Sequence, residues 1–208
     1  MAPGEPFSQR RIGLTGGIAS GKSSVGHWLA QQGLPVLDAD QFAREALAPG
    51  RPATTSVMQR YGARIQAEGG AAVDRAALGR IVFQDPAERL WLEQLIHPIV
   101  RERFDQALSF HAKTPAVVLM IPLLFEAGLE SLCSEIWLVD CDESQQLERL
   151  IARDGLSPDA AQARIAAQWP LSRKRVLADH VLANRGQIGA WKTQAMGLLN
   201  TMGSADPG

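Results

Sequence analysis

The sequence predicts an α/β protein built on a parallel β-sheet. Short apolar segments alternate along the chain with amphipathic helical patterns, as expected for strands joined by helical crossovers. Residues 116–121 form a continuous apolar run, which is typical of a strand buried on both faces. A glycine-rich turn joins the first expected strand to the first expected helix.

Composition narrows the class of protein further. The 208 residues carry a formal net charge of −1 and are 46% hydrophobic and 21% charged, so one domain with a sizeable core is expected. The charge balance argues against a nucleic-acid partner, and no apolar run approaches the roughly 20 residues of a membrane helix. Cys133 and Cys141 do not make a disulfide framework, so we expect a cytoplasmic protein.

The first elements surround the glycine-rich turn. A strand over residues 11–15 leads through the turn into a helix over residues 22–32, for which Gly33 is a suitable C-cap. A second strand over residues 34–37 ends at the acidic segment Asp38-Ala39-Asp40.

The rest of the chain divides into a long helical segment and a second strand-helix series. Residues 41–111 are mostly helical in pattern, with breaks at Pro49-Gly50, Gly69-Gly70 and Asp85-Pro86, and this segment is a candidate substrate-covering insertion. Further strands are expected over residues 116–121, 136–139 and 181–183, and helices over residues 143–153, from Ser157-Pro158-Asp159 onward, and over residues 188–202.

Residues 16–23, here called the phosphate loop, read Gly-Gly-Ile-Ala-Ser-Gly-Lys-Ser and fit the pattern G-x-x-x-x-G-K-[ST]. Gly16 and Gly21 permit unusual backbone angles, so that successive N–H groups can face an anion. The helix that begins near Lys22 adds the positive end of its dipole. Lys22 is expected to reach the β- and γ-phosphates of a nucleotide, and Ser23 to bind Mg²⁺.

Motifs elsewhere in the sequence distinguish the types of phosphate-loop protein. A GTPase would carry an Asn-Lys-x-Asp motif, which is absent, and the strand that could end in a motor-type aspartate is followed by Pro122 instead. Asp38 and Asp40 follow the second strand, at the sheet edge where ligands gather, and in an extended segment both carboxylates would point the same way. One could accept a proton or hold the Mg²⁺ shell, and one could cap a helix beginning at Gln41.

Further motifs follow in a fixed order along residues 11–185. They are Leu14 to Ser23, Asp38-Ala39-Asp40 with Ala43-Arg44, Leu95-Ile96-His97-Pro98 with Arg101, Ile121 to Glu126, Gln146-Leu147-Glu148-Arg149 with Arg153, Arg164 to Gln168, and Ala178-Asp179 with Asn184. This ordered set resembles the dephospho-coenzyme A kinase family.

The resemblance implies a transferase of coenzyme A biosynthesis. The ATP-dependent kinase would pass the γ-phosphate of ATP to the 3′-hydroxyl of the ribose of dephospho-CoA, giving CoA and ADP, with Mg²⁺ as cofactor. The implied fold is a P-loop kinase core with a five-stranded parallel sheet flanked by helices, a helical CoA-binding insertion and a small helical lid. We expect dephospho-CoA as the partner molecule, and a monomer, with a small homo-oligomer as the alternative.

These parts map onto the chain as one kinase domain over residues 10–203. The core is expected over residues 10–40, 114–145 and 178–203, the insertion over residues 41–113, the lid over residues 146–177, and flexible ends over residues 1–9 and 204–208.

The resemblance also implies roles for single residues. Asp40 matches the catalytic aspartate, as base or as orienter of the 3′-hydroxyl, and Asp38 would support it or hold Mg²⁺ through water beside Ser23. Arg149 matches a lid arginine on the transferring phosphate, and Arg153 lies one helical turn further on the same face. The expected catalytic set is Asp40, Lys22 and Arg149.

Two larger sets complete the implied site. The ATP-binding set is Gly16, Gly17, Ile18, Ala19, Ser20, Gly21, Lys22, Ser23, Ser24, Arg149, Arg153 and Asn184, the last near the adenine. The acceptor-binding set is Asp40, Arg44, His97, Arg101, Pro122, Leu123, Leu124, Phe125 and Glu126, although Arg44 and Arg101 could equally be surface charges and Leu123 to Phe125 core. Glu126 requires a partner, and Ala19, which replaces the family's usual glycine, is tolerated if its φ is negative.

Two other functions remain open from the residues. Another small-molecule P-loop kinase, of the shikimate or nucleoside type, would also place acidic residues after the second strand. A nucleotide-binding regulator without turnover would keep the phosphate loop but would not need Asp40 together with the lid arginines. The His-Pro and Pro-Leu-Leu-x-Glu segments and the long helical insertion favour a dephospho-CoA kinase over both alternatives.

Overall fold

The computed structural model describes residues 9–67, 69–70, 72–186 and 189–200. The chain divides into two compact units, one of residues 1–37 with 112–208 and one of residues 38–111. The ends predicted to be flexible, residues 1–9 and 204–208, lie outside the described residues apart from Gln9. None of the described helices is long and apolar enough to span a bilayer.

The five strands form one parallel sheet, as predicted. They are β1 (Arg10–Gly16), β2 (Val36–Asp38), β3 (Ala116–Met120), β4 (Glu135–Asp140) and β5 (His180–Ala183), in the order β2-β3-β1-β4-β5. The strand β1 lies between β3 and β4 and pairs in parallel with both. The chain that leaves β1 therefore emerges at the centre of the sheet.

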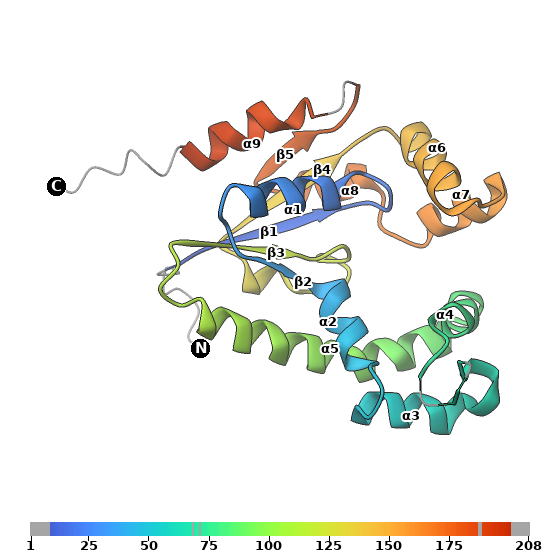
Figure 1. Ribbon diagram of the computed structural model, residues 1–208. Coiled ribbons are helices and arrows are strands. Elements are labelled where there is room, and N and C mark those ends of the chain that lie inside the picture. Colours follow the sequence, from blue (N-terminus) through green and yellow to red (C-terminus); the bar gives the residue numbers. More distant parts are fainter. Residues whose placement is uncertain (1–8, 68, 71, 187–188, 201–208) are drawn as a thin grey trace. The chain divides into compact units, whose positions relative to one another are not determined.

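One face of the sheet is covered by α1 (Lys22–Gln31) and α9 (Trp191–Asn200), which lie side by side (Figure 1). Alternate strand residues such as Ile12, Leu14 and Trp137 form a core cluster with residues of both helices. The Trp28 and Trp191 rings meet edge to face, with centroids 5.6 Å apart. The last helix was expected over residues 188–202, and its predicted ends fall partly outside the described residues.

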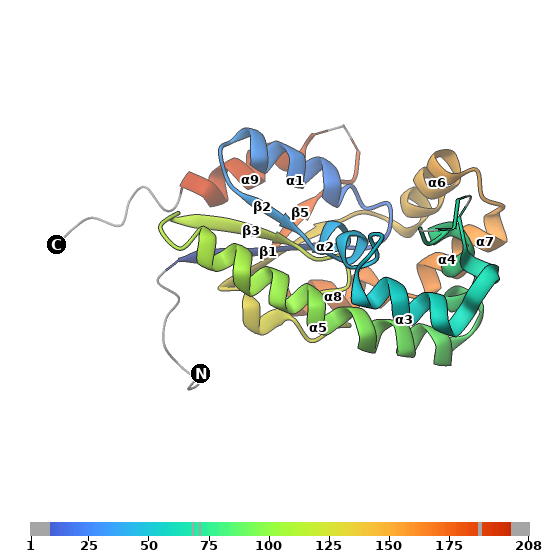
Figure 2. The same ribbon diagram turned by 60° about the horizontal axis from the view of Figure 1, so that its bottom comes forward.

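Three short helices occupy the region predicted as a lid: α6 (Glu143–Asp154), α7 (Pro158–Ala166) and α8 (Leu171–Leu177). A capping box between Asp142 and Gln145 starts α6, and Gly155, with φ +64°, ends it. Ser157 caps α7, as its Ser-Pro-Asp start predicts. Figure 2 shows α6 and α7 packed together.

The second unit is helical, with α2 (Ala39–Ala46), α3 (Pro52–Tyr61), the short 3₁₀ helix η1 (Gly62–Ile65), α4 (Arg75–Gln84) and α5 (Pro86–Phe110). The segment before β4 contains a second 3₁₀ turn, η2 (Glu130–Leu132). The predicted break at Asp85-Pro86 is the start of α5, where Asp85 accepts N–H groups of the first turn. The Phe42 and Phe104 rings meet edge to face with centroids 5.1 Å apart.

A polar cluster joins three strands of the sheet near their starts. Glu135 accepts hydrogen bonds from the Arg10 guanidinium and from Trp137 Nε1, and its carboxylate lies 3.5 Å from His180 Nε2. Burial alone raises the pKa of Glu135, but the hydrogen bonds from Arg10 and Trp137 outweigh burial and lower the pKa below its usual value. The ionised carboxylate therefore stabilises the sheet.

We expect Glu135→Gln to lower the free energy of unfolding by about 1–3 kcal/mol at pH 7, because Arg10 loses its ionised partner. The pKa of Glu135 is lowered on folding, so its contribution is present above the unfolded value of about 4.3 and disappears as the pH falls through the folded value. Urea unfolding should show the gap between variant and wild type narrowing toward pH 3. Glu130→Gln, at an exposed position, is the control, and a constant gap would overturn this role.

Candidate active site

The phosphate loop leaves the central strand β1 and enters α1 directly. Gly21 is the N-cap of α1, with φ +98°, a conformation that favours glycine. Gly16 has no space for a side chain, since a Cβ there would lie 2.5 Å from Ser20 Oγ and 2.9 Å from the Val139 carbonyl oxygen. Lys22 is buried in the first turn of α1, while Ser23 and Ser24 are exposed. The loop therefore has the strand-turn-helix context that its sequence predicts.

Ala19 departs from the expectation for this loop. A negative φ was expected to make alanine acceptable, but its φ is +58°, in the left-handed region. An alanine in that region costs about 1–2 kcal/mol relative to the right-handed conformation. The surrounding loop contacts must therefore offset a local strain that a glycine at this position would avoid.

Three side-chain amides hold the backbone of the loop. The Ile18 carbonyl accepts from Gln146 Nε2 at 2.8 Å, and the Ile18 N–H donates to Gln168 Oε1 at 2.9 Å. The Ser20 carbonyl accepts from Asn184 Nδ2 at 2.8 Å. Asn184, expected near the adenine, thus uses its side chain to hold the loop.

A cavity of about 640 Å³ opens beside the loop between α1 and α9. Five predicted ATP-binding residues line it: Gly21, Ser23, Ser24, Arg149 and Asn184. Seven other lining residues were not predicted from the sequence: His27, Trp28, Gln31, Gly186, Gly189, Trp191 and Lys192. The helical spacing of Ser23, His27 and Gln31 is the signal that could have located part of this wall.

Arg149 and Arg153, the two arginines predicted for the lid, have different surroundings in the structure. Arg149 lines the cavity and donates to the Asn184 carbonyl at 3.1 Å, and its Nη1 is buried with no hydrogen-bond partner among the described atoms. Arg153 instead pairs with Asp154 at 2.7 Å, and Asp154 also pairs with Arg164. Arg153 pairs with its neighbouring carboxylate and does not line the cavity, whereas Arg149 does, so the prediction that both arginines reach one ligand stays a prediction.

The acidic segment after β2 is helical sooner than predicted. The helix α2 begins at Ala39 rather than at Gln41, and Asp38 is its N-cap, accepting from the N–H of Asp40 at 2.8 Å and of Gln41. Asp40 is exposed in the first turn. The two carboxylates are therefore not side by side on an extended segment, and the capping role belongs to Asp38. Arg44 lies 4.0 Å from the Asp38 carboxylate.

Glu126 has the buried partner that its position requires. Its carboxylate lies 2.7 Å from Lys174 Nζ and accepts the Trp169 N–H at 3.0 Å. Lys174 is fully buried on α8 and also donates to the Pro122 carbonyl at 3.4 Å. The role of Lys174 was not predicted, because the adjacent basic residues suggest an exposed helix face and no local pattern marks this lysine as buried.

The apolar part of the same segment belongs to the core. Leu124 is fully buried and Phe125 is 4% exposed, whereas Pro122 and Leu123 are half-buried. This burial favours the alternative that Leu124 and Phe125 are core residues over direct contact with the acceptor.

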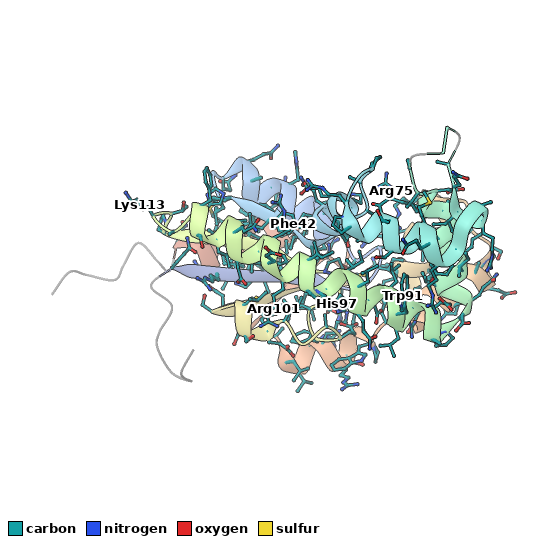
Figure 3. The ribbon with its side chains drawn as sticks, turned by 90° about the horizontal axis from the view of Figure 1, so that it is seen from below. Phe42, Arg75, Trp91, His97, Arg101 and Lys113 are labelled. Atoms are coloured by element: carbon teal, nitrogen blue, oxygen red, sulfur yellow. The ribbon has the colours of Figure 1, made fainter. Side chains whose placement is uncertain are left out.

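The remaining acceptor candidates lie on the long helix α5. His97 and Arg101 are four residues apart and exposed, and both side chains come from this helix (Figure 3). His97 precedes Pro98, which lies inside the helix.

The cysteines offer no reactive thiolate. Cys133 and Cys141 are both free and buried. Burial raises the pKa of Cys133 to about 12 and also raises the pKa of Cys141. Both cysteines therefore behave as small apolar side chains.

A magnesium ion fits the loop without a carboxylate cluster. The described residues contain no group of three or more His, Cys, Asp or Glu side chains that could hold a metal. Phosphate-loop enzymes hold Mg²⁺ through one hydroxyl, the nucleotide phosphates and water. The exposed Ser23 hydroxyl at the edge of the cavity is suited to this.

Gly21→Ala should weaken ADP affinity at least about tenfold, because a Cβ at Gly21 would lie 2.2 Å from Asn184 Nδ2 and displace the amide that holds Ser20. Gly33→Ala is a matched control, since Gly33 also has a positive φ, +86°, but no atom within 4 Å of an added Cβ. Both variants should lose about 1–2 kcal/mol of stability through strain. Equal ADP affinities of the two variants in calorimetry would contradict the role of the close contact.

Comparison with known proteins agrees with this geometry. A family model for dephospho-CoA kinase matches residues 10–190. A dephospho-CoA kinase of Synechococcus sp. (strain CC9605) is 84% identical over 206 residues, covering 99% of this chain and 100% of that protein. The dephospho-CoA kinase of Gloeobacter violaceus is 51% identical over 194 residues and covers 93% of both chains.

Solved structures show the same fold. A dephospho-CoA kinase from Campylobacter jejuni matches with a TM-score of 0.69 at 25% identity, covering 92% of this chain and 96% of that chain. A shikimate kinase from Acinetobacter baumannii, at 16% identity and a TM-score of 0.51 over 97% of each chain, shares the P-loop kinase fold alone. By its sequence along nearly its whole length, this chain belongs to the dephospho-CoA kinase family.

Proposed function

We propose that this protein transfers the γ-phosphate of ATP to the 3′-hydroxyl of the ribose of dephospho-CoA, giving CoA and ADP. The observation that carries the acceptor is the family match over residues 10–190. The donor site is supported by the phosphate loop between β1 and α1 and by the adjoining cavity of about 640 Å³. A cavity of that size is within the range of small-molecule sites.

On the donor side, the loop amides and Lys22 would bind the β- and γ-phosphates, and Ser23 would hold Mg²⁺. Bound Mg²⁺ would neutralise the negative charge that develops on the leaving oxygen. Arg149 lines the cavity with a buried Nη1 that lacks a hydrogen-bond partner among the described atoms, which supports a role in binding phosphate oxygens. The aromatic side chains of His27, Trp28 and Trp191, which line the cavity, would contact the nucleoside.

On the acceptor side, Asp40 would orient the 3′-hydroxyl and accept its proton. Asp40 is exposed in the first turn of α2, at the positive end of the helix dipole. Asp38, as the N-cap, would fix the start of α2 and so position Asp40. Phosphoryl transfer has little covalent chemistry for the protein to perform, so this positioning is the main contribution expected of the pair.

The helical segment over residues 41–113 is proposed to bind the CoA moiety, with Arg44, His97 and Arg101 as contacts, and residues 146–177 are proposed as the lid. A monomer is the proposed working unit, with a small homo-oligomer as the alternative. The free cysteines fit a reducing compartment, which supports a cytoplasmic location.

The direct test is to incubate the protein with Mg-ATP and a panel of hydroxyl acceptors and to follow ADP formation. Dephospho-CoA should stimulate ADP formation strongly, whereas shikimate and nucleosides should leave it at the background rate. Turnover on another acceptor without stimulation by dephospho-CoA would overturn the proposal.

A further inference from the structure

Two carbonyl groups of the phosphate loop accept hydrogen bonds from side-chain amides. Gln146 Nε2 donates to the Ile18 carbonyl at 2.8 Å, and Asn184 Nδ2 donates to the Ser20 carbonyl at 2.8 Å. The two donors come from separate elements, α6 and the segment after β5, that are 128 and 164 residues from their acceptors in sequence. The loop conformation therefore depends on distant parts of the chain.

These contacts fix the direction of the neighbouring N–H groups. A trans peptide is planar, with its C=O and N–H on opposite sides, and the described backbone contains no cis peptide bond. Holding the Ile18 carbonyl toward Gln146 directs the Ala19 N–H away from Gln146. Holding the Ser20 carbonyl toward Asn184 directs the Gly21 N–H away from Asn184 in the same manner.

Gln146 is built into the fold as a fixed donor. It is 4% exposed, and it lies in the first turn of α6, which the capping box between Asp142 and Gln145 anchors. The position of its amide also explains why residue 17 is a glycine, although the φ of Gly17 is not positive. A Cβ on Gly17 would lie 2.3 Å from Gln146 Nε2, so that the glycine leaves space for the amide.

We propose that Gln146 is a positioning residue for phosphoryl transfer: its amide holds the Ile18 carbonyl outward, so that the Ala19 N–H faces the nucleotide phosphate. The same contact offsets the strain of Ala19, which keeps its φ of +58°. Gln168, by accepting the Ile18 N–H, holds the adjacent peptide and connects the loop to the end of α7. The proposal rests on the proposed function for the nature of the reaction, but its first consequence is anion binding.

The test compares Gln146→Met with wild type. Methionine is similar in volume but cannot donate a hydrogen bond. Calorimetry without acceptor should show the affinities for ADP and for inorganic pyrophosphate falling at least about tenfold, equal to about 1.4 kcal/mol. The KM for ATP should rise while the KM for dephospho-CoA stays within about twofold.

Gln162→Met is the matched control, because Gln162 is exposed on α7 and its amide bonds to Glu143 rather than to the loop. It should bind ADP as wild type does. A Gln146→Met protein that loses stability in urea but keeps wild-type affinities for ADP and pyrophosphate would overturn the proposal, since a purely structural role predicts that result.

Gly17→Ala provides a second, independent variant in which Gln146 is retained. It should reproduce the loss of ADP affinity by displacing the amide, and combining it with Gln146→Met should add little further loss. Fully additive losses would contradict a shared mechanism. Because ADP binding needs no acceptor, absence of turnover on dephospho-CoA would refute the proposed function while this comparison still decides the role of Gln146.

Discussion

Replacing Asp40 with asparagine should lower kcat on dephospho-CoA by at least about a hundredfold, while ATP and ADP still bind. The carboxylate is exposed in the first turn of α2, where it is proposed to orient the acceptor hydroxyl and take its proton. Asparagine keeps the size of the side chain but removes the negative charge and the basicity. A positioned acid–base group typically contributes a factor of 10² to 10⁴ to the rate. Steady-state kinetics together with ADP calorimetry measures both parts of this expectation.

Asp74→Asn is a suitable control for Asp40→Asn. Asp74 also lies at a helix start, where it caps α4, and asparagine is an equally good N-cap. Its turnover should therefore match wild type. Near-normal kcat in Asp40→Asn would remove Asp40 from the mechanism.

Lys22→Ala should reduce both nucleotide affinity and turnover, with kcat/KM for ATP falling at least about a thousandfold. Lys22 is buried in the first turn of α1, directly after Gly21, where a charge-assisted contact to phosphate is strong. Its loss removes positive charge that neutralises the phosphates in the ground state and in the transition state. The measurement is ADP affinity by calorimetry alongside single-turnover rates at saturating ATP.

Lys113→Ala, at an exposed position before β3, controls for removal of one positive charge. It should leave ADP affinity and turnover unchanged. If Lys22→Ala bound ADP as tightly as the control and lost turnover alone, the proposed ground-state contact of Lys22 with phosphate would be wrong.

The features that the sequence predicted well are those whose signal is local. The apolar run of β3, the Ser157-Pro158 start of α7 and the glycine-bounded phosphate loop each depend on a few adjacent residues. The parallel sheet follows from the alternation of such segments, because a crossover helix leaves little choice of strand direction. The alternation of segments was therefore sufficient for the parallel α/β class, and the family resemblance implied the five-stranded kinase core.

Two kinds of feature could not be predicted from the sequence. Some depend on contacts between residues far apart in the chain, and others on a residue that is compatible with two local structures. Gln146 and Gln168 meet Ile18 across 128 and 150 residues, and the pairing of Glu126 with Lys174 also joins residues that are not close in the sequence. The start of α2 was missed because Asp38 could end a strand or cap a helix, and hydrogen bonds to two N–H groups of the first turn favour the cap.

The most direct test of the central claim is the position of the transferred phosphate. Mass spectrometry and ³¹P NMR of a reaction with Mg-ATP and dephospho-CoA should show one CoA formed per ADP, with the new phosphate on the 3′-hydroxyl. An analogue lacking the 3′-hydroxyl should accept no phosphate. Formation of ADP without phosphorylated product, or phosphate on another hydroxyl of dephospho-CoA, would contradict the account.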